Sequence, residues 1–339
     1  MTDEQIQDLI RFFPSRGEAD LPQLVETHIS WVILTGKWAF KLKKPVKFDF
    51  LDFSTLEKRR YYCQEEVRLN NRLTQGVYLG VVPVVKTKEG LRLEQEGEVV
   101  DYAVKMNRLD NSRQMNKLLE KGEVHPAHME ALAEQLAAFH LRADVVEKET
   151  GPEAMKEDFA NLEAVKPCIE KKLGSEAGRE LSECIAFAGN FLDKLAPRMA
   201  ERARQGCIVD GHGDLHSRNI FLLPEPVIFD CIEFNPHFRQ VDVLDELAFL
   251  CMDLDFHGAR HLEEPFLQTY LRENPRISED ADWAIFSYYK WYRANVRLKV
   301  NALRAMEEEN PEAESAVEEY WQLFTTYYHS LMEEWVGQV

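Results

Sequence analysis

The segment 210–230, DGHGDLHSRNIFLLPEPVIFD, constrains the fold of this chain more than any other stretch of its sequence. Asp214 lies on a loop beside Gly213, Asn219 follows five residues later, and Asp230 follows after eleven more. The apolar runs 219–223 and 227–229 predict two short paired strands. Such a pairing would bring the loop and both strand ends together. The segment therefore predicts one site built from these three polar side chains.

The residue types in this segment favour phosphoryl transfer. A carboxylate can orient an attacking hydroxyl and accept its proton, which is the catalytic role that we predict for Asp214. Carboxylate and amide oxygens are ligands that Mg²⁺ prefers, so Asn219 and Asp230 are the predicted metal ligands. The spacing Asp-x-x-x-x-Asn is the one found in kinase catalytic loops, with Asp230 in the place of the later metal-binding aspartate.

The motif resembles the catalytic core of the aminoglycoside phosphotransferase and choline kinase group, which has a protein-kinase-like fold. The matched residues are His212, Gly213, Asp214, Asn219 and Asp230. The blocks KLKKPVKFDFLDFST and CIEFNPHFRQVDVLDELAFL are similar to an uncharacterised bacterial branch of this group, and the similarity covers roughly residues 27–306. The resemblance implies an ATP- and Mg²⁺-dependent phosphotransferase that moves the γ-phosphate to a hydroxyl of a small-molecule acceptor.

We expect an α+β fold with two lobes of the protein-kinase-like type. Runs of β-branched and aromatic residues around Thr35-Gly36 predict a hairpin over 30–42, followed by a helix over 55–74 and strands at 78–85 and 99–106. Long helices are predicted at 126–143, 176–204, 241–252, 282–306 and 313–335. The predicted N-lobe, 1–108, is a nucleotide-binding antiparallel sheet plus one helix. The predicted C-lobe, 109–339, is mainly helical and carries the catalytic loop and the acceptor site, and a cleft between two such domains is a common ligand site.

The predicted nucleotide site begins with a lysine on the second strand of the hairpin. The resemblance implies that Lys41 fixes the ATP phosphates and pairs with Glu66 of the following helix. Lys43 is an alternative, because strand side chains alternate with a period of two, and Glu65 is the alternative to Glu66. No G-x-G-x-x-G precedes Lys41, which leaves open the backbone that covers the phosphates.

Two further residues are predicted to contact the nucleotide base. Met106 and Asn107 fall where the hinge between the lobes would meet adenine, although core packing explains Met106 equally well. The choice between ATP and GTP stays open at this stage.

A basic segment marks the predicted acceptor side. Residues 283–306 contain five Lys or Arg residues and no Asp or Glu. One interpretation is that Arg293 and Arg297 hold an anionic acceptor, because a planar guanidinium suits phosphate and carboxylate groups. The other interpretation is that these arginines pair with acidic residues of the same lobe. His216 and Glu233 are further candidates for substrate binding, although an exposed loop histidine also describes His216.

The net charge bears on which partners the protein can bind, and the cysteines bear on its cellular location. Lys and Arg number 41 against 59 Asp and Glu, and the resulting net charge of −18 disfavours nucleic acids and anionic membranes as partners. Residues 1–20 carry no signal-peptide pattern, and no apolar run approaches the ~20 residues of a membrane helix. The six cysteines form no Cys-x-x-Cys pair. We therefore expect a cytoplasmic protein with free thiols, and the sequence predicts no oligomeric state.

Two alternatives to a small-molecule kinase stay open. One is a nucleotide-binding regulatory protein on a kinase-like scaffold that transfers no phosphate, since a fold does not guarantee a chemistry. The other is a protein Ser/Thr kinase. The joint presence of Asp214, Asn219 and Asp230 argues against the first, and the missing glycine-rich signature fits the second less well.

Overall fold

A computed structural model of the chain describes residues 1–13, 21–147, 152–307 and 310–336. The chain divides into two compact units. The first unit contains Met1–Lys117 together with His212–Asp214 and Arg218–Arg239. The second unit contains Leu118–Gly211, Leu215–Ser217 and Gln240–Val339. The predicted catalytic segment thus packs mainly with the N-terminal part of the chain.

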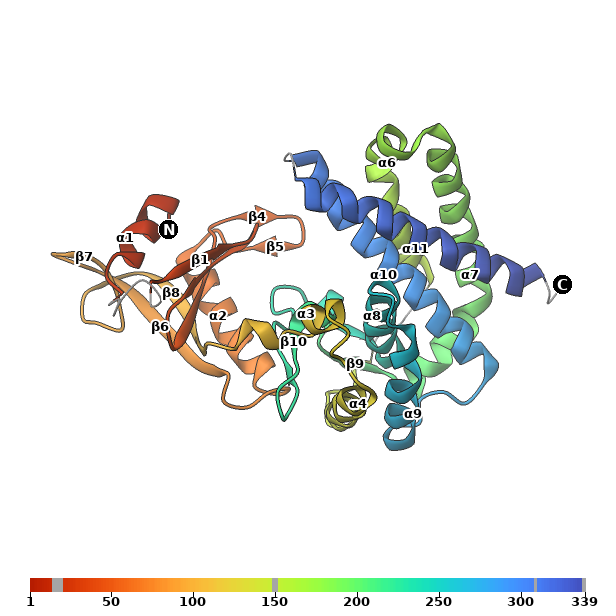
Figure 1. The fold of residues 1–339 in the computed structure, drawn as a ribbon, viewed down its shortest axis with the longest axis horizontal. Coiled ribbons are helices and arrows are strands. Elements are labelled where there is room, and N and C mark those ends of the chain that lie inside the picture. The colour runs from red at the N-terminus through yellow and green to blue at the C-terminus, as the bar shows by residue number, and fades with distance from the viewer. Residues whose placement is uncertain (14–20, 148–151, 308–309, 337–339) are drawn as a thin grey trace. The chain divides into compact units, whose positions relative to one another are not determined.

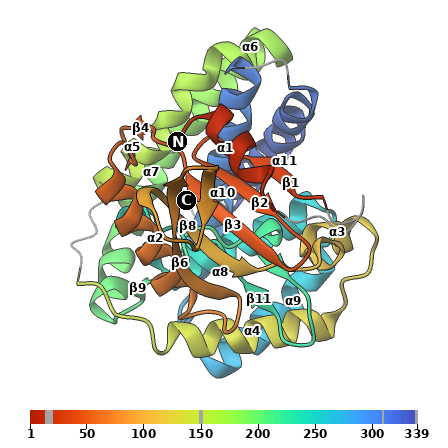
Figure 2. The ribbon, with the colours of Figure 1, turned by 90° about the vertical axis from the view of Figure 1, so that its left-hand side faces the viewer.

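The first unit is built on a six-stranded antiparallel sheet (Figures 1 and 2). The strand order across the sheet is β1-β2-β3-β8-β6-β7, so the hairpin β2–β3 joins a second antiparallel group through the β3–β8 pair. The bounds are β1 Gln23–Glu26, β2 Ser30–Leu34, β3 Trp38–Lys43, β6 Tyr78–Thr87, β7 Gly90–Leu93 and β8 Glu98–Asn107.

The two faces of the sheet bury different side chains of β3. Phe40 and Leu42 pack in a cluster with Ile6 and Leu9 of helix α1 (Asp3–Ile10). Ala39 packs on the other face with Cys63 of helix α2 (Leu56–Asn70). Because side chains alternate along a strand, Lys41 and Lys43 lie on the α2 face.

The late segment of the first unit forms a small hairpin of its own. Strand β10 (Ile220–Phe221) pairs with β11 (Val227–Ile228), and Phe229 N donates to Asn219 O at 3.1 Å. Phe221 and Val227 belong to the same apolar cluster as Ala39 and Cys63. The hairpin is therefore part of the core on the α2 face. A further short pair, β4 (Lys47–Phe48) with β5 (Leu51–Asp52), precedes α2.

The second unit consists mainly of helices. Helix α8 is buried along almost its whole length, and α10 packs along α11 (Figure 1). Strand β9 (Ile208–Asp210) pairs with β12 (Gln240–Asp242), and the last residue of β12 is the N-cap of α8. The helix bounds are α3 Met115–Glu120, α4 Pro126–His140, α5 Pro152–Ala160, α6 Lys166–Leu173, α7 Ser175–Arg204, α8 Val243–Phe256, α9 Glu263–Glu273, α10 Asp280–Glu307 and α11 Pro311–Val336.

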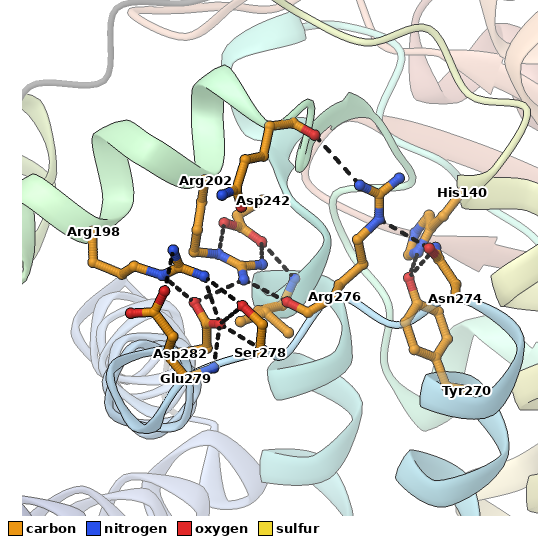
Figure 3. Close-up of polar contacts among 12 residues, drawn as sticks. His140, Arg198, Arg202, Asp242, Tyr270, Asn274, Arg276, Ser278, Glu279 and Asp282 are labelled. Carbon is orange, nitrogen blue, oxygen red and sulfur yellow. Dashed lines mark hydrogen bonds and ion pairs between the residues drawn. The ribbon is translucent and has the colours of Figure 1, made fainter.

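A buried charge network joins three elements of the second unit (Figure 3). Arg202 of α7 donates to Asp242 Oδ1 from Nη2 at 2.7 Å and to Asp282 Oδ1 from Nη1 at 3.0 Å. Arg198, one turn earlier, donates to Asp282 from Nε at 2.8 Å. Asp242 also caps α8 by accepting a hydrogen bond from Leu244 N. The network therefore ties α7 to the starts of α8 and α10.

The predicted α+β class is confirmed by this arrangement of a β-rich N-terminal sheet and a largely helical C-terminal region. Each of the six cysteines carries a free thiol. Among the residues that the structure describes, none of the helices combines the length and the apolar character needed to cross a bilayer.

Candidate active site

The loop that carries Asp214 is fixed through His212, whose side chain is fully buried. Asp214 N donates to His212 Nδ1 at 3.2 Å, so the ring proton lies on Nε2 and is donated to Phe229 O at 2.9 Å. The carbonyl of His212 accepts a hydrogen bond from Ile232 N at 3.1 Å. His212 thus joins the loop to the backbone on both sides of Asp230.

The structure brings Asp214 and Asn219 into direct contact. The amide Nδ2 of Asn219 donates to Asp214 Oδ2 at 2.9 Å and to Asp214 O at 3.0 Å. Both bonds use the amide nitrogen, which leaves the amide oxygen as the atom that Asn219 would offer a cation. The carboxylate of Asp214 is held in one orientation by the same contact.

Gly213 is required by the shape of the loop. Its φ is +86°, and a Cβ at this position would lie 2.6 Å from Phe238 O and 2.9 Å from Arg239 Cα. A side chain would therefore meet both an unfavourable backbone conformation and fixed backbone atoms.

We expect Gly213→Ala to lower both the thermal midpoint and any activity of the site. The left-handed backbone alone costs about 1–2 kcal/mol for a residue with a Cβ, and the clash with Phe238 adds to it. Gly189→Ala is a matched control, because Gly189 lies in α7 with no atom within 4 Å of an added Cβ. A Gly213→Ala protein that melts with the Gly189→Ala control would contradict this account of the loop.

Lys41 connects Glu66 to Asp230. Its Nζ lies 2.9 Å from Glu66 Oε1 and 2.5 Å from Asp230 Oδ1. Burial lowers the pKa of Lys41, but the carboxylates of Asp230 and Glu66 outweigh it and hold the pKa well above its ordinary value. Burial likewise raises the pKa of Glu66, but Lys41 and Lys43 outweigh it and bring the pKa to about 2. Both members of the Lys41–Glu66 pair are therefore charged at neutral pH.

The backbone of Asp230 adopts an unusual conformation. Its φ is +63°, in the left-handed region that few residues other than glycine occupy. Asp230 N donates to the hydroxyl of Tyr78. The side chain of Asp230 stays 40% exposed, although Glu66, which contacts the same Lys41, is wholly buried. Such a local strain is typical of a functional position, where the surrounding fold holds a side chain in place.

The ion pairs in the structure bear on two choices that the sequence left open: Glu65 or Glu66 on α2, and Lys41 or Lys43 on β3. Glu65 pairs with Arg68 of the same helix at 2.7 Å, so Glu66 is the carboxylate that faces the lysines. Both lysines contact it: Lys43 Nζ lies 2.7 Å from Glu66 Oε2 and also donates to Glu233. The sequence prediction had Glu233 as a substrate residue, whereas the structure buries it against Lys43.

The predicted adenine contacts lie in the sheet. Met106 is 8% exposed and belongs to the apolar cluster on the α2 face, as the packing alternative predicts. Asn107 donates from its side-chain amide to Gly76 O at 2.5 Å and from its backbone to Val77 O at 2.9 Å.

The three remaining acceptor candidates lie in the second unit. His216 is 5% exposed and packs against the ring of Phe249, so the prediction of an exposed loop histidine is wrong. Arg293 forms a buried two-fold ion pair with Asp245, at 2.6 and 2.7 Å, as the alternative interpretation of the basic segment predicts. Arg297 lies over the ring of Tyr320 and donates to its hydroxyl at 3.3 Å.

The donor atoms of the site fit Mg²⁺. Asp230 offers a partly exposed carboxylate, and Asn219 offers an amide oxygen. Mg²⁺ typically takes one or two such protein ligands and completes its coordination with waters and substrate phosphates. These two residues would therefore suit a magnesium ion that is bound together with a nucleotide.

No protein-family model matches the chain. Proteins of Mycobacterium tuberculosis and Mycobacterium bovis whose names assign no activity are 34% identical to it over 285 residues, which is 82% of this chain and 54% of theirs. The chain thus spans about half the length of the curated relatives that it matches.

Solved structures of small-molecule kinases share the fold. A choline kinase from Cryptosporidium parvum matches with a TM-score of 0.56 at 10% identity, covering 98% of this chain and 94% of its own. A choline/ethanolamine kinase family protein from Mesorhizobium loti matches with a TM-score of 0.55 at 14% identity, covering 98% and 95%. A glucosamine kinase in complex with glucosamine, ADP and inorganic phosphate matches with a TM-score of 0.50 at 14% identity, covering 93% and 77%. The chain therefore has the kinase-like fold that its sequence motif predicts.

Proposed function

We propose that the protein is an ATP-dependent phosphotransferase that moves the γ-phosphate to a hydroxyl of a small-molecule acceptor. The observation that carries the proposal is the connection between two pairs of residues in the first unit. Lys41 bridges Glu66 and Asp230, Asn219 holds Asp214, and His212 ties the Asp214 loop to the backbone around Asp230. Positioning of this kind supplies most of the catalysis in phosphoryl transfer.

The polar residues of the site have distinct roles in the proposed reaction. Asp214 orients the acceptor hydroxyl and accepts its proton, and its contact with Asn219 keeps the carboxylate aligned. Lys41, kept charged by Glu66, binds the ATP phosphates. Asn219 and Asp230 hold Mg²⁺, which when bound neutralises charge on the phosphates. The adenine contacts of Met106 and Asn107 stay predictions, as does the preference for ATP over GTP.

The fold neighbours support the class of reaction. Two of them are named as choline or choline/ethanolamine kinases, and the third was captured with a sugar amine, ADP and inorganic phosphate. All are kinases of small molecules, which favours a small acceptor over a protein acceptor here. The identity of the acceptor does not follow from them.

The contacts of the four predicted acceptor residues bear on which of them could bind the acceptor. Glu233 and Arg293 are held in buried ion pairs, so their charges are already balanced within the protein. Roles of His216 and Arg297 toward the acceptor stay predictions, as does the cytoplasmic location.

Incubation with γ-labelled ATP, Mg²⁺ and a whole-cell extract tests the proposal. We expect label in the small-molecule fraction, since the acceptor is a metabolite. Label in protein bands would point instead to a protein kinase. Binding of Mg-ATP without label transfer to either fraction would point to the regulatory alternative, and both of these results would overturn the proposal.

A further inference from the structure

A second lysine lies beside the one that is proposed to bind phosphates. The side chain of Lys43 is 1% exposed, and its Nζ contacts Glu66 and Glu233, whose side chains are 0% and 4% exposed. It also lies 4.8 Å from the centre of the Phe53 ring. Lys43 is therefore out of reach of solvent and of any phosphate.

The contacts of Lys43 complete a chain of alternating charges. The order is Asp230, Lys41, Glu66, Lys43 and Glu233, with a close contact between each pair of neighbours. The two lysines come from one face of β3, Glu66 comes from α2, and the two outer carboxylates come from one short segment. The chain of charges therefore starts and ends on the segment that carries Asp230.

The carboxylate of Glu66 is fixed from both sides by this arrangement. Lys41 contacts Oε1 at 2.9 Å, and Lys43 contacts Oε2 at 2.7 Å. Without Lys43, one oxygen of Glu66 would lose its cation and would face the buried carboxylate of Glu233. The orientation of Glu66 toward Lys41 thus depends on Lys43.

The segment after Asp230 is tied to the sheet and to α2 by two contacts. Glu233 accepts a hydrogen bond from Lys43, and Cys231 N donates to Asn70 Oδ1 of α2 at 3.0 Å. These contacts lie on either side of Ile232 and three residues or fewer from Asp230. They limit the positions that Asp230, with its left-handed backbone conformation, can take.

Stability alone is a poor explanation for burying these charges. Removing two charges from water costs so much that an apolar pair of similar volume often gives equal or greater stability. Lys43 already packs against an apolar group, since its Nζ lies over the ring of Phe53. The ion pair therefore points to a requirement for geometry.

We propose that Lys43 and Glu233 are positioning residues for the binding of Mg-ATP. They act through their neighbours: Lys43 sets the carboxylate of Glu66 that holds Lys41, and Glu233 anchors the segment that presents Asp230. Neither touches the nucleotide. This inference rests on the proposed function, because it assigns the pair to the same nucleotide site.

Three variants and a control test the inference: Lys43→Met, Glu233→Gln, the double variant, and Glu65→Gln. Lys43→Met leaves two buried carboxylates without their shared lysine, so we expect a large drop in the thermal midpoint. Adding Glu233→Gln removes one of these charges, so the double variant should recover much of the midpoint. The control Glu65 sits next to Glu66 in sequence but pairs with the exposed Arg68.

Affinity for Mg-ATP distinguishes a positioning role of Lys43 and Glu233 from a role in stability alone. It is measured by calorimetric titration at a temperature where all variants are folded. We expect the double variant to bind Mg-ATP about 10- to 100-fold more weakly than the wild type in spite of its recovered midpoint, a size typical of residues that orient a ligand's own partners. Glu65→Gln should bind as the wild type does. Recovery of affinity together with stability in the double variant would show a purely structural pair and overturn the inference. If the wild type itself binds no Mg-ATP, the proposed function fails and the inference falls with it.

Discussion

Replacing Asp214 with asparagine should lower the rate of phosphoryl transfer by about 10²- to 10⁴-fold, the usual contribution of a positioned proton acceptor. An asparagine side chain keeps the shape of the aspartate and can still accept the hydrogen bond from Asn219 Nδ2. It cannot take the proton of the acceptor hydroxyl. The loop should therefore stay folded, and only the proton transfer should be lost.

Affinity for Mg-ATP gives the internal check on this variant. Asp214 is proposed to face the acceptor, so Asp214→Asn should bind Mg-ATP close to the wild-type level by calorimetric titration. Label transfer from γ-labelled ATP to the small-molecule fraction measures the rate. Asp193→Asn, on the exposed surface of α7, is the matched control and should transfer label as the wild type does. Full activity of Asp214→Asn would rule out its catalytic role.

Replacing Asp282 with asparagine should destabilise the second unit by about 3–5 kcal/mol, the usual cost of removing one partner of a buried ion pair. Asp282 is wholly buried and accepts hydrogen bonds from Arg198 and Arg202 (Figure 3). The substitution leaves two guanidinium groups with less balancing charge at the junction of α7, α8 and α10. Asp280→Asn, at the exposed start of the same helix, should change stability by less than about 0.5 kcal/mol. Denaturant unfolding monitored by circular dichroism measures both, and equal stabilities would refute the role of the network.

The contribution of the Asp282 carboxylate to the stability of the fold should depend on pH. Burial raises the pKa of Asp282, but hydrogen bonds from Arg198, Ser278 and Arg202 outweigh it and hold the pKa well below its ordinary value. A group of this kind stabilises the folded state above its unfolded pKa of about 3.9, and the contribution is lost as the pH falls through that value toward the folded pKa. The difference in stability between the wild type and Asp282→Asn should therefore be full above about pH 5 and should shrink as the pH is lowered.

The polar residues of the site could be predicted from sequence because they lie on elements with strong local signals. The glycine turn of the β2–β3 hairpin fixes which residues of β3 share a face, and a helix long enough to be recognised carries Glu66. Period-two alternation then places both lysines toward that helix. The choice between Glu65 and Glu66 depends on the rotation of α2, which only the packing of Cys63 and Leu69 determines.

Contacts between distant parts of the chain could not be predicted in this way. Lys43 and Glu233 are 190 residues apart, and no spacing rule connects them. The burial of His216 depends on Phe249 of α8, and the pairing of Arg293 depends on Asp245 of the same helix. Helix α1 was missed because eight residues are too few for a recognisable pattern, and its stability comes from burying Ile6 and Leu9 against the sheet.

The late hairpin β10–β11 has a consequence for the order in which the protein can fold. Phe221 and Val227 complete the apolar cluster that covers the α2 face of the N-terminal sheet. During synthesis on the ribosome, the sheet strands emerge more than 100 residues before these two side chains, so that face stays partly uncovered while those residues are added. The N-terminal sheet therefore reaches its final packing late, and its core residues and its proposed phosphate-binding lysine become fixed in the same step.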